Sequence, residues 1–210
     1  IFILILTVSC GSKPETVLSK FIDNVKEKKI ENAFKDYVVN QDAEGNMHLE
    51  YNNKTQQLLF EKLFENLEYK IVKTEKQDAN TSVVTVEIKN IDVKKVFKKM
   101  FEKMLQDTFS NGNNNSTSSE DEFKSIIESK NVPKSTYTTD FVVVKTENGN
   151  KIEITPENMD VLLGKLITTL QNPGNLDDND QEPQTGVSED GPNAGDTQKP
   201  NEPKIENNGK

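Results

Sequence analysis

Apolar side chains recur every three or four residues through the first third of the chain. Residues 17–25, 30–38 and 53–67 each show this spacing, which predicts three amphipathic helices. The sequence Ser12-Lys13-Pro14-Glu15 has the Ser-x-x-Glu form of a capping box, so we expect the first helix to begin there. The polar segment 41–51 is predicted to be a loop before the third helix.

The apolar spacing then changes to every second residue. Residues 69–74 and 84–88 alternate on either side of turn-like residues at 77–80, which predicts an antiparallel hairpin. A second hairpin is expected around Asn148-Gly149, a pair that suits a two-residue type I′ turn. In that register Glu147 pairs with Asn150, and Asp140 faces away from the core. The core face then holds Phe141, Val143, Ile152 and Ile154, with Val143 opposite Ile154 and Lys145 opposite Ile152.

Helical spacing returns between and after these hairpins. Asp92 is expected to cap a helix over 93–109, a second capping box spans Ser119 to Glu122, and Thr155-Pro156 begins a final helix that ends at Asn172. The first of these helices carries one broad apolar stripe: Val93, Val96, Phe97, Met100, Phe101, Met104 and Leu105. Its methionines could mark a partner groove, but a core-facing stripe is the favoured interpretation.

The order of these elements predicts the fold class. Three helices, a hairpin, two helices, a hairpin and a helix indicate an α+β domain. We expect a four-stranded antiparallel sheet with helices packed on one face, and a helical insertion between the strand pairs.

Composition adds a tail to this domain. Residues 173–210 contain nine acidic residues and three lysines, five of the eight prolines and no aromatic residue. They account for −6 of the net charge of −9. Isolated apolar residues cannot offset the entropy of ordering such a segment, so we expect a disordered acidic tail after a single domain at 13–172.

The basic residues exclude one class of partner. All 26 are lysines, so the chain has no guanidinium group for bidentate contacts to phosphate or guanine. Together with the acidic net charge, this argues against nucleic-acid binding. Five lysines on one helix (Lys94, Lys95, Lys98, Lys99 and Lys103) could lie against anionic phospholipid, although solvent is the default expectation.

The N-terminal residues IFILILTV precede Cys10, the single cysteine of the chain. This apolar run is too short to span a bilayer, and it resembles the end of a secretory signal within a longer precursor. Val8, Ser9 and Cys10 resemble the lipobox of bacterial lipoproteins, with Thr7 in place of its usual aliphatic residue. The resemblance implies removal of residues 1–9, diacylglycerol and palmitate on Cys10, and a tether at 10–12. It implies anchoring on the extracytoplasmic face of the cell membrane.

A second resemblance concerns the domain itself. The stretch PETVLSKFIDNVKEKKIENAFKDY is similar to the opening helices of NTF2-like (cystatin-like) lipoproteins of Gram-positive bacteria. The helical segment from 91 to about 130 and the closing strand–turn–strand–helix resemble the same group, although the tryptophan often found in the last strand pair is missing. The resemblance implies a cone-shaped fold with a pocket between sheet and helices, and no particular activity.

Candidate chemistry is sparse. His48 is the single histidine, so neither a zinc site nor a Ser–His–Asp arrangement can be assembled. Tyr37, Tyr69 and Tyr137 could project inward, whereas the strand carboxylate of Asp140 is predicted to point outward. The acidic segment LDDNDQE at 176–182 lacks the glycine and the final glutamate of a calcium loop.

The sequence therefore predicts a lipid-anchored binding module without catalytic residues, cofactor or metal. A hydrophobic small molecule, a peptide or an envelope protein is the expected partner. The alternatives are a small NTF2-like enzyme acting in the cone pocket and a structural or surface lipoprotein acting through its acidic tail.

Overall fold

The computed structural model describes residues 12–39, 50–110 and 118–174. These residues belong to the first of two units into which the chain divides, Ile1–Leu176. The predictions for Cys10, His48 and the acidic tail after 174 lie outside the described residues, as does most of the expected loop at 41–51. No helix of the described ranges is both long and apolar enough to cross a membrane.

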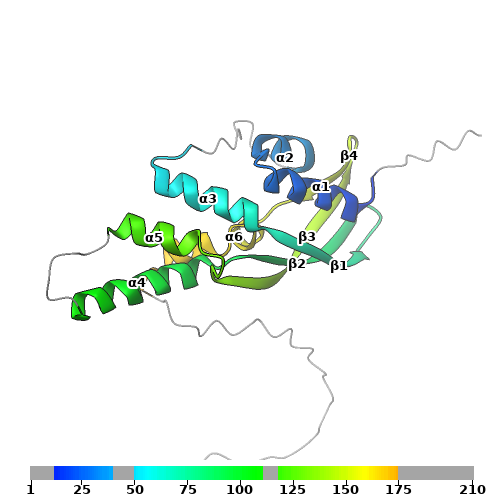
Figure 1. Cartoon of the computed structure of the whole chain (residues 1–210). Helices are drawn as coiled ribbons and strands as arrows, with labels where there is room; N and C mark the ends of the chain where they lie inside the picture. The colour runs from blue at the N-terminus through cyan, green and yellow to red at the C-terminus, as the bar shows by residue number, and fades with distance from the viewer. Residues whose placement is uncertain (1–11, 40–49, 111–117, 175–210) are drawn as a thin grey trace, which may run out of the picture. The chain divides into compact units, whose positions relative to one another are not determined.

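Four antiparallel strands form one sheet in the order β1-β2-β3-β4 (Figure 1). The strands are β1 (Glu68–Lys76), β2 (Thr81–Ile91), β3 (Lys134–Thr146) and β4 (Gly149–Glu153). The helices are α1 (Pro14–Lys26), α2 (Ile30–Tyr37), α3 (Lys54–Asn66), α4 (Val93–Ser110), α5 (Ser119–Ile127), α6 (Pro156–Leu162) and α7 (Leu166–Gln171). The predicted α+β class and the helical segment between the strand pairs are confirmed, while the NTF2-like likeness stays a prediction.

Helices α1, α3 and α6 pack on the sheet, and α2 contacts β4. The main core lies between this helix layer and the inner face of the strands. Its largest fully buried side chains include Phe21, Leu18 and Ile22 from α1, and Phe141, Ile88 and Ile152 from the strands. This burial confirms the predicted inward positions of α1. Burial of large apolar side chains is what drives these faces together.

A second apolar cluster lies where β2 ends. It joins Leu59 and Leu63 of α3, Ile91, Val93 and Val96 around the start of α4, Phe123, Ile126 and Ile127 of α5, and Leu166 of α7. This cluster attaches α4 and α5 to the sheet domain. Only the first part of α4 takes part in it.

Two helix caps differ from the expected ones. The first helix is capped by Lys13, whose side chain makes no capping hydrogen bond, with Pro14 as the first helical residue. Proline suits this position because its missing N–H has no partner in a first turn. In α5 the cap is Ser118, which accepts from the backbone N–H of Asp121. Both predicted capping boxes, at Ser12 and at Ser119, are therefore wrong by one residue.

The last hairpin has a register two residues away from the predicted one. Val143 pairs with Ile152, and Thr146 pairs with Gly149. A type I′ turn needs positive φ at both central residues, but of the residues around this turn only Gly149 has it, at +103°. The hydroxyl of Thr146 donates to the Gly149 carbonyl oxygen at 2.7 Å and accepts from Asn148 N–H at 3.2 Å. These hydrogen bonds close a turn at residues 147–148, one residue before the predicted turn at 148–149.

This shift leaves the two faces of the sheet as predicted. A displacement of two residues keeps every side chain on its own face, since successive side chains alternate. Phe141, Val143 and Ile152 are buried, Ile154 packs at the core margin, and Asp140 is exposed on the opposite face.

The predicted final helix is broken in two. Its beginning is confirmed, because Thr155 caps α6 in a capping box with Asn158. The chain then leaves the helix at Leu163, and both Gly164 and Lys165 adopt left-handed backbone angles before α7 starts. Leu170, expected to be part of the apolar stripe, is 62% exposed.

The apolar stripe of α4 is only partly buried. Val93 and Val96 are buried, and Phe97 and Met100 are half-buried against the second cluster. Beyond Met100 the expectation of a core-facing stripe is wrong. The side chains of Phe101, Met104, Leu105 and Phe109 are 53%, 44%, 41% and 85% exposed.

Candidate functional site

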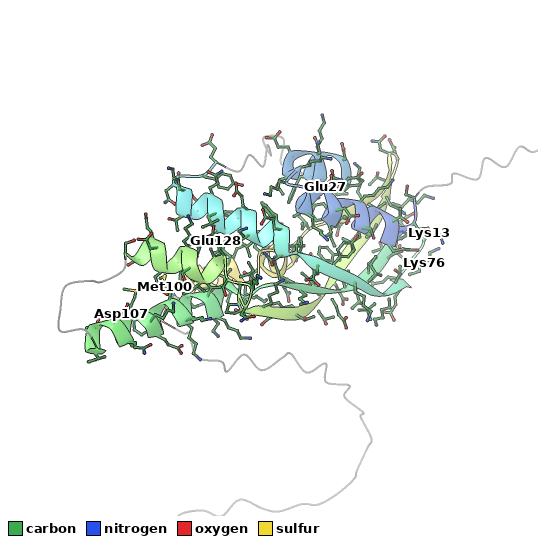
Figure 2. All side chains as sticks on the ribbon, viewed as in Figure 1. Lys13, Glu27, Lys76, Met100, Asp107 and Glu128 are labelled. Carbon is green, nitrogen blue, oxygen red and sulfur yellow. The ribbon has the colours of Figure 1, made fainter. Side chains whose placement is uncertain are left out.

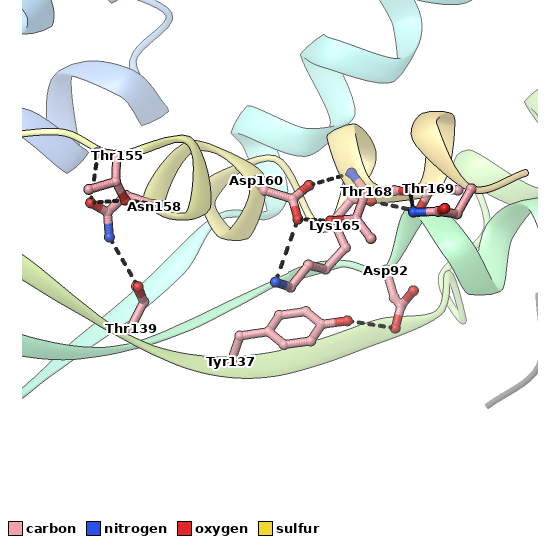
Figure 3. Close-up of polar contacts among 10 residues, drawn as sticks. Asp92, Tyr137, Thr139, Thr155, Asn158, Asp160, Lys165, Thr168 and Thr169 are labelled. Atoms are coloured by element: carbon pink, nitrogen blue, oxygen red, sulfur yellow. Dashed lines mark hydrogen bonds and ion pairs between the residues drawn. The ribbon is translucent and has the colours of Figure 1, made fainter. Parts of the chain in front are cut away.

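Two buried carboxylates mark the most polar part of the interior. Asp92, between β2 and α4, is 3% exposed, and Asp160, in α6, is 5% exposed. Figure 3 shows them on either side of Lys165 and Tyr137. A buried carboxylate is costly unless hydrogen bonds satisfy it, so the partners of each one indicate what it does.

Asp92 caps α4, as the sequence predicts. Its Oδ1 accepts from the backbone N–H of Lys95 at 3.0 Å. Its Oδ2 accepts from the hydroxyls of Ser135 at 2.6 Å and Tyr137 at 3.1 Å. The Lys95 ammonium lies 3.3 Å from the same oxygen. The carboxylate thus connects the first turn of α4 to the beginning of β3.

Asp160 supplies a cap to the neighbouring helix. Lys165 precedes α7 and provides no side-chain cap of its own. Instead Asp160 accepts from the backbone N–H of Thr168 at 3.0 Å and from the Thr168 hydroxyl. The Lys165 ammonium lies 3.5 Å from Asp160 Oδ2 and 5.4 Å from the centre of the Tyr137 ring. A cation in this place balances the buried charge and stacks on an aromatic face.

Asn158 joins α6 to the middle of β3. Its side-chain oxygen accepts from Thr155, and its amide donates to Thr139 Oγ1 at 3.0 Å and to the Asp140 carbonyl oxygen at 2.9 Å. All these groups are buried or partly buried. Asn158 therefore fixes both the start of α6 and its position on the sheet.

The Asp92 cluster has a contact that could suggest catalysis. Lys95 Nζ donates to Ser135 Oγ at 2.8 Å, and a serine beside a lysine can act as a nucleophile when the lysine accepts its proton. Here the lysine is an ammonium ion-paired with Asp92, and the serine hydroxyl already donates to that carboxylate. The arrangement satisfies both the Asp92 carboxylate and the Ser135 hydroxyl with hydrogen bonds. Within the described ranges, no group of three or more His, Cys, Asp or Glu side chains could hold a metal ion.

The strand carboxylate considered from the sequence has a different environment. Asp140 Oδ1 accepts from the Thr85 hydroxyl at 2.5 Å on the outer face of the sheet. The inner face of the strands is lined by apolar side chains, Thr139 and the predicted inward tyrosines Tyr69 and Tyr137. Tyr37 packs at the margin of the same core.

Tyr69 illustrates how the hydroxyls are placed at the core margin. Its hydroxyl donates to Asp23 Oδ1 at 3.1 Å and approaches the Ser19 carbonyl oxygen at 3.4 Å. Burial raises the pKa of Tyr69, and the nearby Asp23 carboxylate raises it further. The group holds its proton in the folded state and links β1 to α1.

The remaining feature is a surface. The second half of α4 exposes the apolar side chains of Phe101, Met104, Leu105 and Phe109, and an exposed apolar patch is a candidate interaction surface. In Figure 2 the labelled Asp107 of this half and Lys13, at the start of α1, lie at opposite ends of the described domain. The lysines expected to form a basic face are partly engaged, since Lys95 pairs with Asp92 and Lys103 with Glu122.

Three residues of these polar clusters were not predicted from the sequence: Asp160, Asn158 and Ser135. The cue for Asp160 was a carboxylate inside an apolar helical pattern, where a charged residue needs a partner. Asn158 stands three residues after the Thr155 cap, a position that commonly returns a hydrogen bond to the cap. Ser135 carries no local signal, because its role depends on the approach of β3 to Asp92.

Comparisons with known proteins assign this chain to no family. No protein-family model matches the chain, and a search of curated proteins gives no match. Among solved structures, the chain is similar to a candidate lipoprotein, YcdA, from Bacillus subtilis, with 11% identity and a TM-score of 0.38. The similarity covers 71% of this chain and 44% of YcdA, so this chain spans less than half of the length of YcdA. A TM-score of this size establishes neither a common fold nor a common function.

Proposed function

We propose that this chain is a lipid-anchored, extracytoplasmic interaction module. Cys10 holds the domain at the membrane, and the exposed apolar half of α4 binds a protein partner. The observation that carries the proposal is the placement of that half of α4 at the end of the domain away from Lys13, where the tether would enter (Figure 2).

The short tether determines which end of the domain would lie near the membrane. Three residue steps separate Cys10 from Lys13, and a fully extended chain of that length spans at most about 11 Å. An acylated Cys10 would therefore keep the start of α1 close to the membrane. The apolar end of α4 would then be presented to partners in the extracytoplasmic space.

The shape of the surface favours a protein over a small molecule. Small ligands are enclosed in concave sites, whereas Phe101, Leu105 and Phe109 stand on the outside of a single helix. An exposed helix face of this kind fits helix-in-groove or helix-on-helix recognition. The proposal assigns no catalysis, because Asp92 and Asp160 are used in helix capping and Asp140 points away from the core.

Cell fractionation tests the anchoring. Cys10→Ala in the full precursor should move the protein from the membrane fraction to the medium, while Ser12→Ala, in the tether, should leave it in the membrane fraction. Protease added outside intact cells should cleave the wild-type protein. Unchanged membrane retention of Cys10→Ala, or full protection from external protease, would overturn the proposal.

A further inference from the structure

The exposed apolar residues of α4 form a ridge along the helix. Phe101, Leu105 and Phe109 follow one another at intervals of four residues, and Met104 lies beside Leu105. Side chains spaced four apart form the ridges that interlock most often when two helices pack. The ridge is 41–85% exposed, so this contact surface is not used by the described part of the fold.

Three residues of this ridge, Phe101, Leu105 and Phe109, read the same in both directions along the helix. A two-fold axis through Leu105 would place Phe101 against Phe109 of a second copy, and Leu105 against Leu105. Such a self-complementary patch is what an isologous interface between identical chains requires. We propose that the partner of the α4 ridge is a second copy of this chain, with the two helices antiparallel. This inference rests on the proposed function and names its partner.

The charges along α4 fix the orientation of the pair. All its lysines (Lys94, Lys95, Lys98, Lys99 and Lys103) precede Met104, with Glu102 as the one acidic residue among them, and Asp107 follows Met104. Parallel pairing would bring two lysine-rich halves together, which like-charge repulsion opposes. Antiparallel pairing separates these halves and places each near the negative end of the partner helix.

A bilayer fits this ridge less well than a second copy. A helix that lies on anionic lipid needs lysines that are free to reach the headgroups. Lys95 is ion-paired with Asp92, and Lys103 with Glu122. The ridge also lies at the end of the domain opposite Lys13, where the tether would enter (Figure 2).

The size of the ridge indicates a weak contact. Four partly exposed side chains per copy supply less than the roughly 800 Å² per partner of a standard stable interface. The dimer should therefore depend on concentration. Anchoring confines the chains to one surface and raises their effective concentration.

Cysteine crosslinking of the full-length chain in its native membrane tests this pairing. The chain has one native cysteine, Cys10, so Leu105→Cys adds a single reporter at the axis. A short bis-maleimide should convert Leu105→Cys into a covalent homodimer. Three controls should not give that band: the wild-type chain, Val72→Cys on the 48% exposed part of β1, and Leu105→Cys combined with Phe101→Ser and Phe109→Ser.

Several outcomes would overturn the inference. The first is that Leu105→Cys gives no crosslinked homodimer, or gives no more homodimer than Val72→Cys does. The second is that the homodimer band persists in the triple variant. The third is that Leu105→Cys is crosslinked only to a different protein. Protection of the thiol introduced by Leu105→Cys from maleimide by lipid, without dimer, would assign the ridge to the membrane instead. The same crosslinking on detergent-solubilised protein at rising concentration separates a failed dimer contact from failed anchoring, because it does not need the membrane.

Discussion

Gly164 lies directly against the backbone of Ile91. A Cβ atom on Gly164 would come within 1.9 Å of the Ile91 carbonyl oxygen, and the Gly164 carbonyl oxygen accepts from Val93 N–H at 3.0 Å. This contact holds the break between α6 and α7 against the end of β2 and the start of α4. It links the turn after α6, the helix that carries Asp160, to the start of α4, which Asp92 caps.

Replacing this glycine should strongly destabilise the domain. Gly164→Ala introduces both the clash with Ile91 and a methyl group at a φ of +62°, so we expect a loss of about 3 kcal/mol or more in the free energy of unfolding. Gly174→Ala is the matched control, because nothing lies within 4 Å of its Cβ position, and it should change stability by less than about 0.5 kcal/mol. Urea unfolding of both variants measures the difference, and equal stabilities would contradict the tight contact.

The two faces of β3 should respond differently to truncation. Phe141 is fully buried, so Phe141→Ala should cost about 3–5 kcal/mol. Asp140 is exposed and makes one hydrogen bond with Thr85, so Asp140→Ala should cost about 1 kcal/mol or less. Thermal or urea unfolding compares the two, and similar losses would mean that the assigned faces are wrong.

Tyr69 should make stability depend on alkaline pH. Its pKa is raised above 10.0, first by burial and then by Asp23, so the folded state retains the proton that the unfolded state releases. The raised pKa of Tyr69 therefore contributes to the free energy of unfolding. This stabilisation is fully present below about pH 10 and is lost as pH rises through the raised folded-state pKa.

Tyr69→Phe should therefore lower stability near neutral pH by about 0.5–1.5 kcal/mol through the lost hydrogen bond. The difference between wild type and variant should shrink at about pH 11, where the unfolded wild type has released its proton. Urea titrations at the two pH values measure this difference. A constant difference would show that Tyr69 does not titrate differently in the two states.

The orientation of α4 predicts a contrast between two phenylalanines. Phe109 is 85% exposed and Phe123 is 5% exposed. Phe109→Ser should leave the unfolding free energy within about 0.5 kcal/mol of wild type, whereas Phe123→Ser should cost about 3 kcal/mol or more. A large loss with Phe109→Ser, measured on dilute monomeric protein, would mean that the α4 ridge is buried within the chain itself.

The sequence by itself determined the elements and their faces. Apolar spacing is a local signal, and it identified α1, α2, α3 and α5 with their buried sides and the paired strands of both hairpins. Asp92 and Thr155 were recognisable as caps because a cap bonds the backbone two or three residues ahead. The inner face of β3 was predictable even with the wrong hairpin register, since a shift of two residues leaves the alternation unchanged.

Only the tertiary structure decided where these elements stop and what they contact. The break at Gly164 depends on Ile91, which is 73 positions earlier in the chain, and Asp160 becomes a cap only because α7 turns back beside it. The stripe of α4 is continuous in sequence, but its second half stays exposed because the apolar cluster around Val96 and Ile127 covers only the first half. Periodicity shows which side of a helix is apolar. The positions of distant segments determine how much of that side is buried, and therefore how much remains for a partner.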